Sequence, residues 1–368
     1  MSGRSIFGHV DISALREQFP VLGRLAYLNA GTDGPLPVRA RDAAAAELER
    51  ELGEGRAHAH FERRAQLSAA LRQEYAAVLG CATDDLALTS GTSEGLSIVV
   101  EGLRLGAGDE ILTSDEEHPG LLGALQAVRD LAGVRIRVAP FQELANAVTP
   151  TTTLVACSHV NWTRGAFAPA ELAEVDVPVV FDGAQGAGAV PIDLAALGCD
   201  AYAAAGQKGL CGPDGTGLLY VGPKLRERLA VTRRSYANLA DGSAGLAADL
   251  QPDARRFDTA SLSAEAVATA GAAVGVLADF GWSALHGRAI SLAERFASRL
   301  AEVGRTVAPR GPSTLVSFSS VDPEAERERL SAAGVVVRSL PGGQWLRASV
   351  GAWNDESDLE RLLAALDR

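Results

Sequence analysis

Short apolar runs alternate with segments of helical periodicity through the middle of the chain. The runs with the length and apolar content of strands occupy residues 110–113, 134–138, 153–157, 179–182, 201–204 and 217–221. Several are apolar at consecutive positions, as strands are when both faces of a parallel sheet are covered. Helical stretches lie between them, for example at residues 120–132. The pattern predicts an α/β layer with a mainly parallel sheet.

The pattern changes after about residue 260. A helix-rich stretch at residues 264–304 precedes strand-like runs at 315–319, 335–340 and 345–349, and the chain ends in an amphipathic helix at 356–366. This order predicts a second, smaller α+β domain. We therefore expect an N-terminal arm (residues 1–25), a large domain (26–258) and a small C-terminal domain (259–368).

Composition narrows the class of protein. The hydrophobic fraction is 47%, as in a globular chain, and the net charge of -12 argues against a general binder of nucleic acid or of anionic membranes. No apolar run is long enough to span a bilayer, and residues 1–10 lack the apolar core of a signal peptide. The four cysteines form no Cys-x-x-Cys pair. We expect a reduced, cytoplasmic chain without a metal site.

Lysine is rare in this chain, because almost all of the 34 basic residues are arginine. The lysines are Lys208 and Lys224. Arginine stays protonated, whereas lysine can lose its proton and form an imine with a carbonyl group. Lys208 lies in a glycine-dense loop after a strand-like run, while Lys224 has the setting of an exposed first helical turn. Lys208 is therefore the candidate nucleophile.

Asp182 ends an apolar run and is followed by Gly183. Ligands of parallel α/β sheets gather at the carboxyl ends of strands, although an aspartate there can equally cap a helix. Lys208 follows after a segment that has room for a helix and one more strand. Such a pair suits pyridoxal 5'-phosphate (PLP), since the lysine can form an imine with its aldehyde and the acid can hold its pyridine nitrogen protonated.

A phosphate cradle is expected upstream. Gly91, Thr92 and Ser93 follow an apolar segment and open a helix-like stretch. Free amides and hydroxyls at a helix start bind phosphate, although the same letters also form a plain helix start. The segment is not a P-loop, because no Gly-Lys-Ser/Thr follows, and no dinucleotide fingerprint follows a strand.

Three further side chains have two interpretations each. His118 follows a strand-like run, where it belongs either to a solvated acidic turn or to an imidazole stacked on a cofactor ring. Arg338 and Arg347 lie in strand-like runs of the small domain. They form an internal salt bridge or an exposed strand face, or they bind a substrate carboxylate through a planar guanidinium.

Several motifs together resemble the class V aminotransferase family, in the cysteine-desulfurase-like branch of the fold-type I PLP enzymes. The motifs are Phe-Asp-Gly-Ala-Gln at 181–185, Gly-Gln-Lys at 206–208 and Gly-Pro-Asp-Gly-Thr-Gly at 212–217. The resemblance runs from Tyr27 to the last helix. It implies a fold-type I PLP-dependent transferase, with a large domain on a mainly parallel seven-stranded sheet and a smaller α+β C-terminal domain.

The resemblance also implies roles for individual residues. Lys208 would bind PLP covalently, Asp182 would pair with the pyridine nitrogen, and Gln185 would approach the ring hydroxyl. Thr92, with its neighbours Gly91 and Ser93, would hold the phosphate, and His118 would stack on the ring. Arg347 would bind the substrate α-carboxylate. Ser261 matches a position that reaches the partner subunit's phosphate, which implies a homodimer with shared sites. The remaining expected site residues are Gln207 for the cofactor and Arg338, Ala30, Gly31 and Trp162 for the substrate.

The chain departs from the family pattern in ways that bear on the reaction. Gln207 replaces a histidine, and Ala205 replaces a serine that would bind phosphate. Cysteine desulfurases carry a cysteine after the first C-terminal arginine, whereas residues 338–345 contain none. The chain is more similar to the cystine/cysteine C–S lyases and to isopenicillin N epimerase-like members.

The function expected from this pattern is a C–S lyase that acts on cystine, cysteine or a cysteine conjugate. The same lysine, aspartate and phosphate site would also serve an epimerase or an aminotransferase, so both stay open as alternatives. A PLP-fold protein without turnover, acting as a binding or regulatory module, is the alternative from another class.

Overall fold

A sheet of seven strands forms the centre of the molecule. The computed structural model describes residues 11–366. The strands follow the order β2-β8-β7-β6-β5-β3-β4. Their bounds are Leu86–Thr89 (β2), Glu110–Ser114 (β3), Arg135–Ala139 (β4), Thr152–Ser158 (β5), Val179–Asp182 (β6), Ala201–Ala205 (β7) and Gly217–Val221 (β8). Neighbours from β7 to β4 are parallel, and β8 pairs antiparallel with both β7 and β2.

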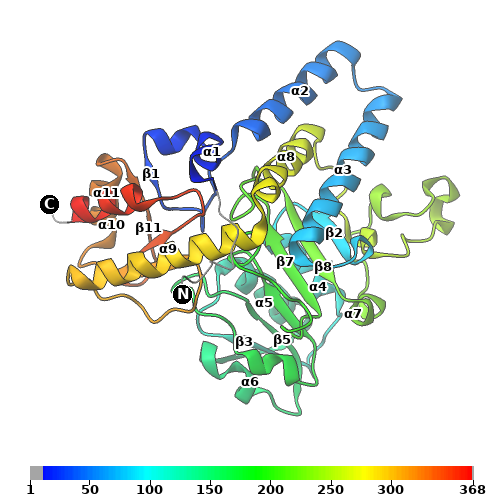
Figure 1. The fold of residues 1–368 in the computed structure, drawn as a ribbon. Helices are drawn as coiled ribbons and strands as arrows, with labels where there is room; N and C mark the ends of the chain where they lie inside the picture. Colours follow the sequence, from blue (N-terminus) through cyan, green and yellow to red (C-terminus); the bar gives the residue numbers. More distant parts are fainter. Residues whose placement is uncertain (1–10, 367–368) are drawn as a thin grey trace, which may run out of the picture.

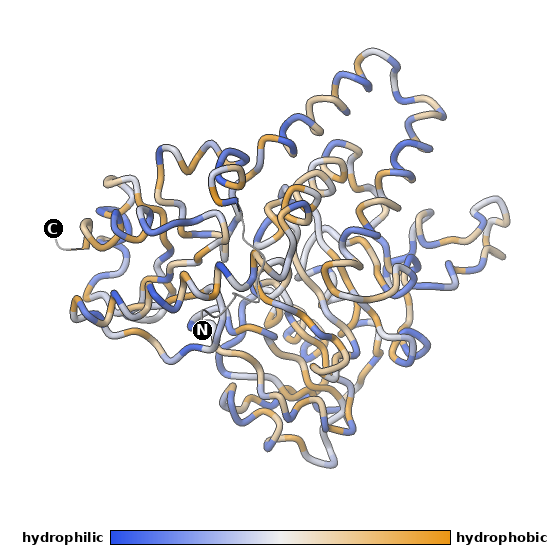
Figure 2. The backbone as a smooth tube through the Cα atoms, in the orientation of Figure 1, coloured by the Kyte–Doolittle hydropathy of each residue, from blue (hydrophilic) through white to orange (hydrophobic). Residues whose placement is uncertain are grey.

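Burial explains why the strand runs were visible in the sequence. Strands β3, β6 and β7 are buried at every position. Strand β4 lies at the edge of the sheet and keeps polar or half-exposed side chains at most positions. Figure 2 shows apolar positions concentrated in the region of this sheet. The mainly parallel α/β layer expected from the sequence is confirmed.

Helices cover both faces of the sheet (Figure 1). One core cluster unites the sheet with α4 (Thr92–Gly102) and α5 (Pro119–Ala132). A second cluster on the other face includes α3 (His58–Leu79) and α8 (Ala264–Phe280). Helix α2 (Val38–Glu54) packs on α8 and forms with α3 a hairpin that projects from the body.

The C-terminal part builds a smaller sheet in the order β11-β12-β9, which is antiparallel. Its strands and their covering helices are β9 (Leu315–Ser319), β11 (Arg338–Ser339), β12 (Trp345–Ser349), α9 (Trp282–Glu302), α10 (Pro323–Ala332) and α11 (Glu356–Leu366). The single strand expected at 335–340 is wrong. Its first half, β10 (Val335–Val336), pairs with β1 (Ala26–Tyr27), and its second half, β11, pairs with β12.

Packing crosses both expected domain boundaries. Ala26 and Leu28 lie in the small-domain core, because the β1–β10 pair carries them there. Val267 and Val274 of α8 lie in a large-domain core cluster. Helix α8 therefore packs with the large domain, and the turn at Gly281 into α9 leads to the small domain. Of the expected N-terminal arm, residues 1–10 lie outside the described residues.

The remaining elements are short. They are α1 (Ile12–Glu17), α6 (Leu144–Ala147), α7 (Pro223–Arg228) and 3-10 helices at Pro20–Gly23, Thr83–Asp85, Phe141–Glu143, Ala170–Glu174, Tyr236–Asn238, Gly242–Ala247 and Ala254–Phe257. Among residues 11–366, no single helix has the length and apolar content to cross a membrane. Helices α8 and α9 meet that test by length and composition when joined, but they are bent by 82°.

Candidate active site

The carboxyl ends of the parallel strands bring the predicted acid to one edge of the sheet. Asp182 is the last residue of β6 and is 5% exposed. Its Oδ1 accepts a hydrogen bond of 2.9 Å from the amide of Ala184. Turns rather than a helix follow Asp182, so the helix-capping alternative is wrong. Asp182 is instead a buried carboxylate at the edge where ligands of such sheets bind.

Lys208 lies in the loop after β7, the strand next to β6. Desolvation lowers the pKa of this half-buried amine, the charge of Asp182 opposes the shift, and the charges of Arg347 and Arg338 add to it. Burial in turn raises the pKa of Asp182, against the effect of Lys208. A lysine with a lowered pKa reaches its neutral, nucleophilic form more readily.

His118 lies between β3 and α5. Its Nδ1 accepts a hydrogen bond of 3.0 Å from the amide of Gly120, so the ring caps α5. The ring meets Trp162 edge-on, with 4.9 Å between centroids. Burial, followed by the charges of Lys208 and the two arginines, lowers the pKa of His118 to about 4. The ring is therefore neutral at pH 7, which favours the stacked imidazole over the solvated acidic turn.

The start of α4 has the features of an anion site. The helix begins at Thr92, after Gly91, and it is 11 residues long. The Thr92 hydroxyl oxygen is buried and has no hydrogen-bond partner among the described residues. The nearby backbone leaves no room for larger side chains, since a Cβ on Gly120 would lie 2.5 Å from Ser93 Oγ and one on Gly217 would lie 2.6 Å from the Gly91 Cα. An orphaned hydroxyl at a helix N-terminus, enclosed by glycines, fits a phosphate group.

The N-terminal segment at residues 30–32 closes the other side of the site. The Gln185 amide donates a hydrogen bond of 2.8 Å to the carbonyl of Gly31, and Ala30 is 8% exposed. A Cβ on Gly31 would lie 2.8 Å from Gln185 Oε1 and 2.9 Å from Arg347 Nη2. Gly31 therefore lets the backbone approach both side chains, and the predicted residues Ala30, Gly31 and Gln185 lie together.

The two arginines are cross-strand neighbours, because Arg338 on β11 pairs in register with Arg347 on β12. Arg347 is fully buried and donates a hydrogen bond of 2.6 Å to the Trp162 carbonyl. Its Nε atom has no hydrogen-bond partner among the described residues. The Arg338 guanidinium lies 5.7 Å from the centre of the Trp162 ring. Both arginines reach the Thr32 hydroxyl, at 3.2 Å from Arg338 and 3.4 Å from Arg347.

Neither arginine forms the internal salt bridge that the sequence left open. Within residues 11–366, no carboxylate oxygen lies within 4.0 Å of Arg338 or Arg347. Burial and the charge of Arg338 lower the pKa of Arg347 to about 9. A buried cation without an anionic partner is costly, so an anion brought by a ligand would compensate the charge of Arg347.

Two further residues were predicted to bind the cofactor. Gln207, next to Lys208, has a buried Oε1 without a hydrogen-bond partner in the described chain. Ser261 is exposed and lies near Tyr236, with 3.4 Å between the two hydroxyl oxygens. The structure of one chain does not bring Ser261 to Lys208.

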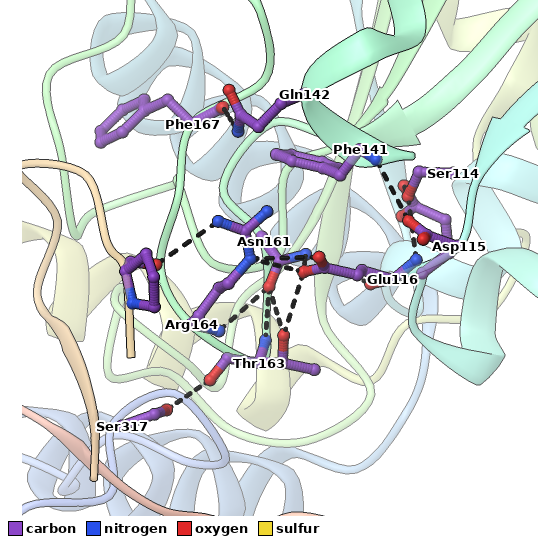
Figure 3. A network of polar contacts seen from close by, with 12 residues as sticks. Ser114, Asp115, Glu116, Phe141, Gln142, Asn161, Thr163, Arg164, Phe167 and Ser317 are labelled. Carbon is purple, nitrogen blue, oxygen red and sulfur yellow. Dashed lines mark hydrogen bonds and ion pairs between the residues drawn. The ribbon is translucent and has the colours of Figure 1, made fainter. Parts of the chain in front are cut away.

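A polar network supports the Trp162 segment and was not predicted (Figure 3). Glu116 accepts hydrogen bonds of 2.7 Å from Asn161 and 2.8 Å from Arg164. The Oδ1 atom of Asn161 in turn accepts hydrogen bonds from the backbone amides of Thr163 and Arg164. Ser317 on β9 donates to the carbonyl of Thr163. The network thus joins the loop before His118 to the small domain. The Asn-x-Thr turn was visible in the sequence as a local signal, but its long-range partners were not.

Comparisons with known proteins identify the family. The model of the family described as Aminotransferase class-V matches residues 26–362. The chain belongs to the class V aminotransferase family. It is 30% identical to isopenicillin N epimerase of Streptomyces clavuligerus over 384 residues, covering 92% of this chain and 94% of the relative. It is also 30% identical to a probable cysteine desulfurase of Pseudomonas aeruginosa, covering 77% of this chain and 78% of the relative.

Solved structures extend the similarity. The cystine C–S lyase C-DES in complex with its reaction product cysteine persulfide matches with a TM-score of 0.90 and 29% identity, covering 95% of this chain and 99% of that chain. A C-DES mutant with glycine covalently linked to the PLP cofactor matches with a TM-score of 0.91 and 28% identity, covering 95% and 98%. The predicted family and the fold-type I architecture are confirmed.

Proposed function

We propose that this protein is a PLP-dependent enzyme that cleaves the C–S bond of cystine, cysteine or a cysteine conjugate. The similarity to C-DES over 95% of the chain supports the reaction class. The cysteine desulfurase relatives support a sulfur-containing amino acid as substrate. Both kinds of relative agree with the site chemistry described above.

The residues present fit PLP. The orphaned Thr92 hydroxyl and the α4 N-terminus would hold its phosphate, with Gly91 and Ser93 beside it. Asp182 would pair with the ring nitrogen, and His118, neutral because of its lowered pKa, would stack on the ring. When bound, PLP supplies a ring that withdraws electrons from the substrate Cα.

The chain's own groups bind the substrate and move its proton. Lys208 would hold the cofactor aldehyde and then, once substrate has displaced it, take the proton from Cα with its Nζ; its lowered pKa favours this neutral amine. Arg347 would hold the α-carboxylate in bidentate fashion and orient Cα. Arg338 would meet a second anion, such as the distal carboxylate of cystine. Trp162 would close the pocket between them.

One observation favours a lyase over a desulfurase. The segment next to the arginines offers no thiol that could attack the substrate sulfur. The segment between β11 and β12 contains no cysteine. Cys211, close in sequence to Lys208, is fully buried, and burial raises the pKa of its thiol. A thiol without exposure or thiolate character does not attack substrate sulfur. After loss of the Cα proton, the Cβ–S bond of that half of cystine would therefore break, and both sulfurs would leave with the other half as its persulfide.

The test is a product assay with the purified protein and PLP. We expect cystine to yield pyruvate, ammonia and a persulfide of the released half without an added keto acid. We expect cystine to be preferred over cysteine, because cysteine lacks the second carboxylate for Arg338. Pyruvate formation that requires a keto acid would instead indicate transamination. No product from cystine, cysteine or their conjugates would refute the proposal.

A second candidate is an amino-acid epimerase. The isopenicillin N epimerase relative, which covers 92% of this chain, favours it. An epimerase would return the proton to the opposite face of Cα, using the same Lys208, Asp182 and phosphate site. Exchange of the Cα hydrogen with deuterated water, with change of chirality and without pyruvate, distinguishes it from the lyase.

We also propose a homodimer with shared sites, acting in the cytoplasm. Ser261 is exposed beside Tyr236, which is itself 61% exposed, as suits a contribution to the partner subunit's phosphate site. All four cysteines are free, in keeping with a reducing compartment.

Subunit mixing tests the shared site. We expect Lys208→Ala and Ser261→Arg each to be inactive alone. When the two are mixed and subunits exchange, one site of each mixed dimer combines an intact Lys208 with an intact Ser261 of the other chain. Activity should then return in about one quarter of all sites. If Ser261 acts within its own chain, or if the protein is a monomer in sedimentation, mixing restores nothing.

A further inference from the structure

Glu117 is a buried acid that the mechanism above does not use. It precedes His118 in the loop after β3 and is 6% exposed. Its carboxyl group lies between the carboxyl ends of β3 and β5. The hydroxyl of Ser114 donates to Oε1 at 2.5 Å, and the amide and hydroxyl of Ser158 donate to Oε2 at 2.9 Å and 2.5 Å. Glu117 therefore bridges two strand ends, one of which pairs in register with Asp182.

No cation compensates this carboxyl group. Among residues 11–366, no Lys, Arg or His nitrogen lies within 4.0 Å of it. The charge that acts on Glu117 is that of Asp182, whose strand position pairs in register with Ser158. Lys208 partly compensates the charge of Asp182, whereas Glu117 has no such partner, so burial and the charge of Asp182 favour a proton on Glu117.

The hydrogen bonds show where that proton fits. The Ser158 amide requires Oε2 as an acceptor. Oε1 faces Ser114 Oγ, which already accepts the amide of Glu116 at 3.2 Å. A proton on Oε1 reverses the Ser114 hydrogen bond, with the serine oxygen as acceptor, and leaves every other contact intact. The neutral acid is thus satisfied in the same geometry.

We propose that Glu117 is a positioning residue that acts as a neutral carboxylic acid: it ties the ends of β3 and β5 together and leaves Asp182 as the sole carboxylate that would pair with the cofactor's ring nitrogen. Its importance for the reaction rests on the proposed function. The bridge fixes the loop that carries His118 and the strand end beside Asp182. It does so without adding a second charge to the site.

The pH dependence follows from the groups around Glu117. These are Asp182 on β6, Cys157 on β5 and His118 on the same loop. Burial raises the pKa of Glu117 from 4.5 to about 7, the three hydrogen bonds oppose the rise, and Asp182 adds to it. The folded state therefore holds this proton more tightly than the unfolded chain. The resulting stability is fully present below pH 4.5 and is lost as the pH rises through about 7.

The first test uses the protein without cofactor, so it does not depend on the proposed function. We expect the infrared carbonyl band of a neutral carboxylic acid to fade between about pH 6 and about pH 8 in the wild type, and this fading component to be missing from Glu117→Gln. The thermal midpoint of Glu117→Gln, relative to wild type, should rise from pH 4.5 to about pH 7, where the wild type loses the stability linked to this proton. If the infrared band of the wild type and the midpoint difference between the two proteins do not change with pH, Glu117 is not a neutral acid.

The second test reads the bound cofactor by its visible absorbance. Above about pH 7 the ionised Glu117 of the wild type favours the protonated cofactor, so its removal in Glu117→Gln should lower the pH midpoint of the absorbance change. An unchanged midpoint would show that the charge of Glu117 does not reach the cofactor, and would overturn the claim that its protonation leaves Asp182 as the sole carboxylate there. If the wild type fails to bind PLP at all, the proposed function fails, and the infrared result still decides the state of Glu117.

Glu110 supplies the matched control at the opposite end of β3. It is 2% exposed; burial disfavours its charge, but hydrogen bonds from Arg137 and Thr152 lower its pKa. Glu110→Gln should therefore leave the fading infrared band and the cofactor midpoint unchanged. Glu117→Ala should lower activity by about tenfold or more, because the buried Ser158 amide loses its acceptor. Activity equal to wild type in Glu117→Ala would contradict the bridge even if Glu117→Gln behaves as expected.

Discussion

Lys208→Ala is expected to abolish turnover and the absorbance of the imine between the lysine and PLP. The amine is the only lysine beside Asp182, and no other side chain among residues 11–366 replaces both its covalent role and its role as a base. Loss of the proton transfer alone lowers the rate by about 10²–10⁴-fold. Absorbance spectra after PLP addition and the pyruvate assay measure both effects. Phosphate affinity through Thr92 should persist, so PLP still binds without the covalent link.

Lys224 is the matched control for this experiment. It lies exposed at the start of α7, whose N1 position is Pro223. Lys224→Ala removes the same functional group from a surface site and should change neither spectrum nor activity. A Lys208→Ala enzyme that still turns over at the wild-type rate, or a Lys224→Ala enzyme that loses its colour, would contradict the assignment.

The fold was accessible from sequence where burial is local. Strands β3, β6 and β7 are buried at every position because both faces of the sheet are covered, and the apolar residues that they contain made each strand visible in the sequence. The strand expected at 335–340 was wrong for the opposite reason. Its division into β10 and β11 depends on pairing with Ala26 and Tyr27, more than 300 residues away. Apolar periodicity carries no information about which distant strand is the partner.

The residues of the candidate site also fall into two groups, those with a signal in the sequence and those known only from long-range contacts. Asp182 was identified because a strand end is a property of a short segment, and Lys208 because lysine is scarce in the whole chain and this lysine follows a strand-like run. Thr32 and Glu117 were not identified, although the first contacts both arginines and the second bridges β3 and β5. Their contacts connect residues from separate parts of the chain. An ordinary threonine and one glutamate in an acidic run give no sign of such partners.

The β1–β10 pairing has a consequence for the position of the two arginines. It holds the N-terminal segment against the small domain, so that Thr32 meets Arg338 and Arg347 while Gly31 contacts Gln185 of the large domain. Ser317 on β9, in register with Arg347, reaches the Trp162 loop. The arginines are therefore positioned by both domains. A substrate carboxylate bound there would be held at a fixed place relative to Lys208.

Arg347→Met is expected to raise the KM for cystine strongly while sparing cofactor binding. Losing a charge-assisted carboxylate contact costs about 1.5–3 kcal/mol, which corresponds to a rise in KM of about 10- to 150-fold. The thermal midpoint of the cofactor-free protein should stay at or above that of wild type. The reason is that the fully buried guanidinium, whose pKa burial lowers to about 9, has no carboxylate partner to lose. Steady-state kinetics and thermal unfolding measure the two effects.

Two further arginine variants separate binding from general loss of charge. Arg305 pairs with Glu326 at 2.7 Å elsewhere in the small domain, so Arg305→Met should leave KM unchanged and lower the thermal midpoint instead. Arg338→Met should raise KM for cystine more than for cysteine, because only cystine offers a second carboxylate to this side chain. An Arg347→Met enzyme with an unchanged KM would show that the buried guanidinium serves the Trp162 carbonyl alone and binds no substrate. Equal effects of Arg338→Met on both substrates would remove the argument for a dianionic substrate.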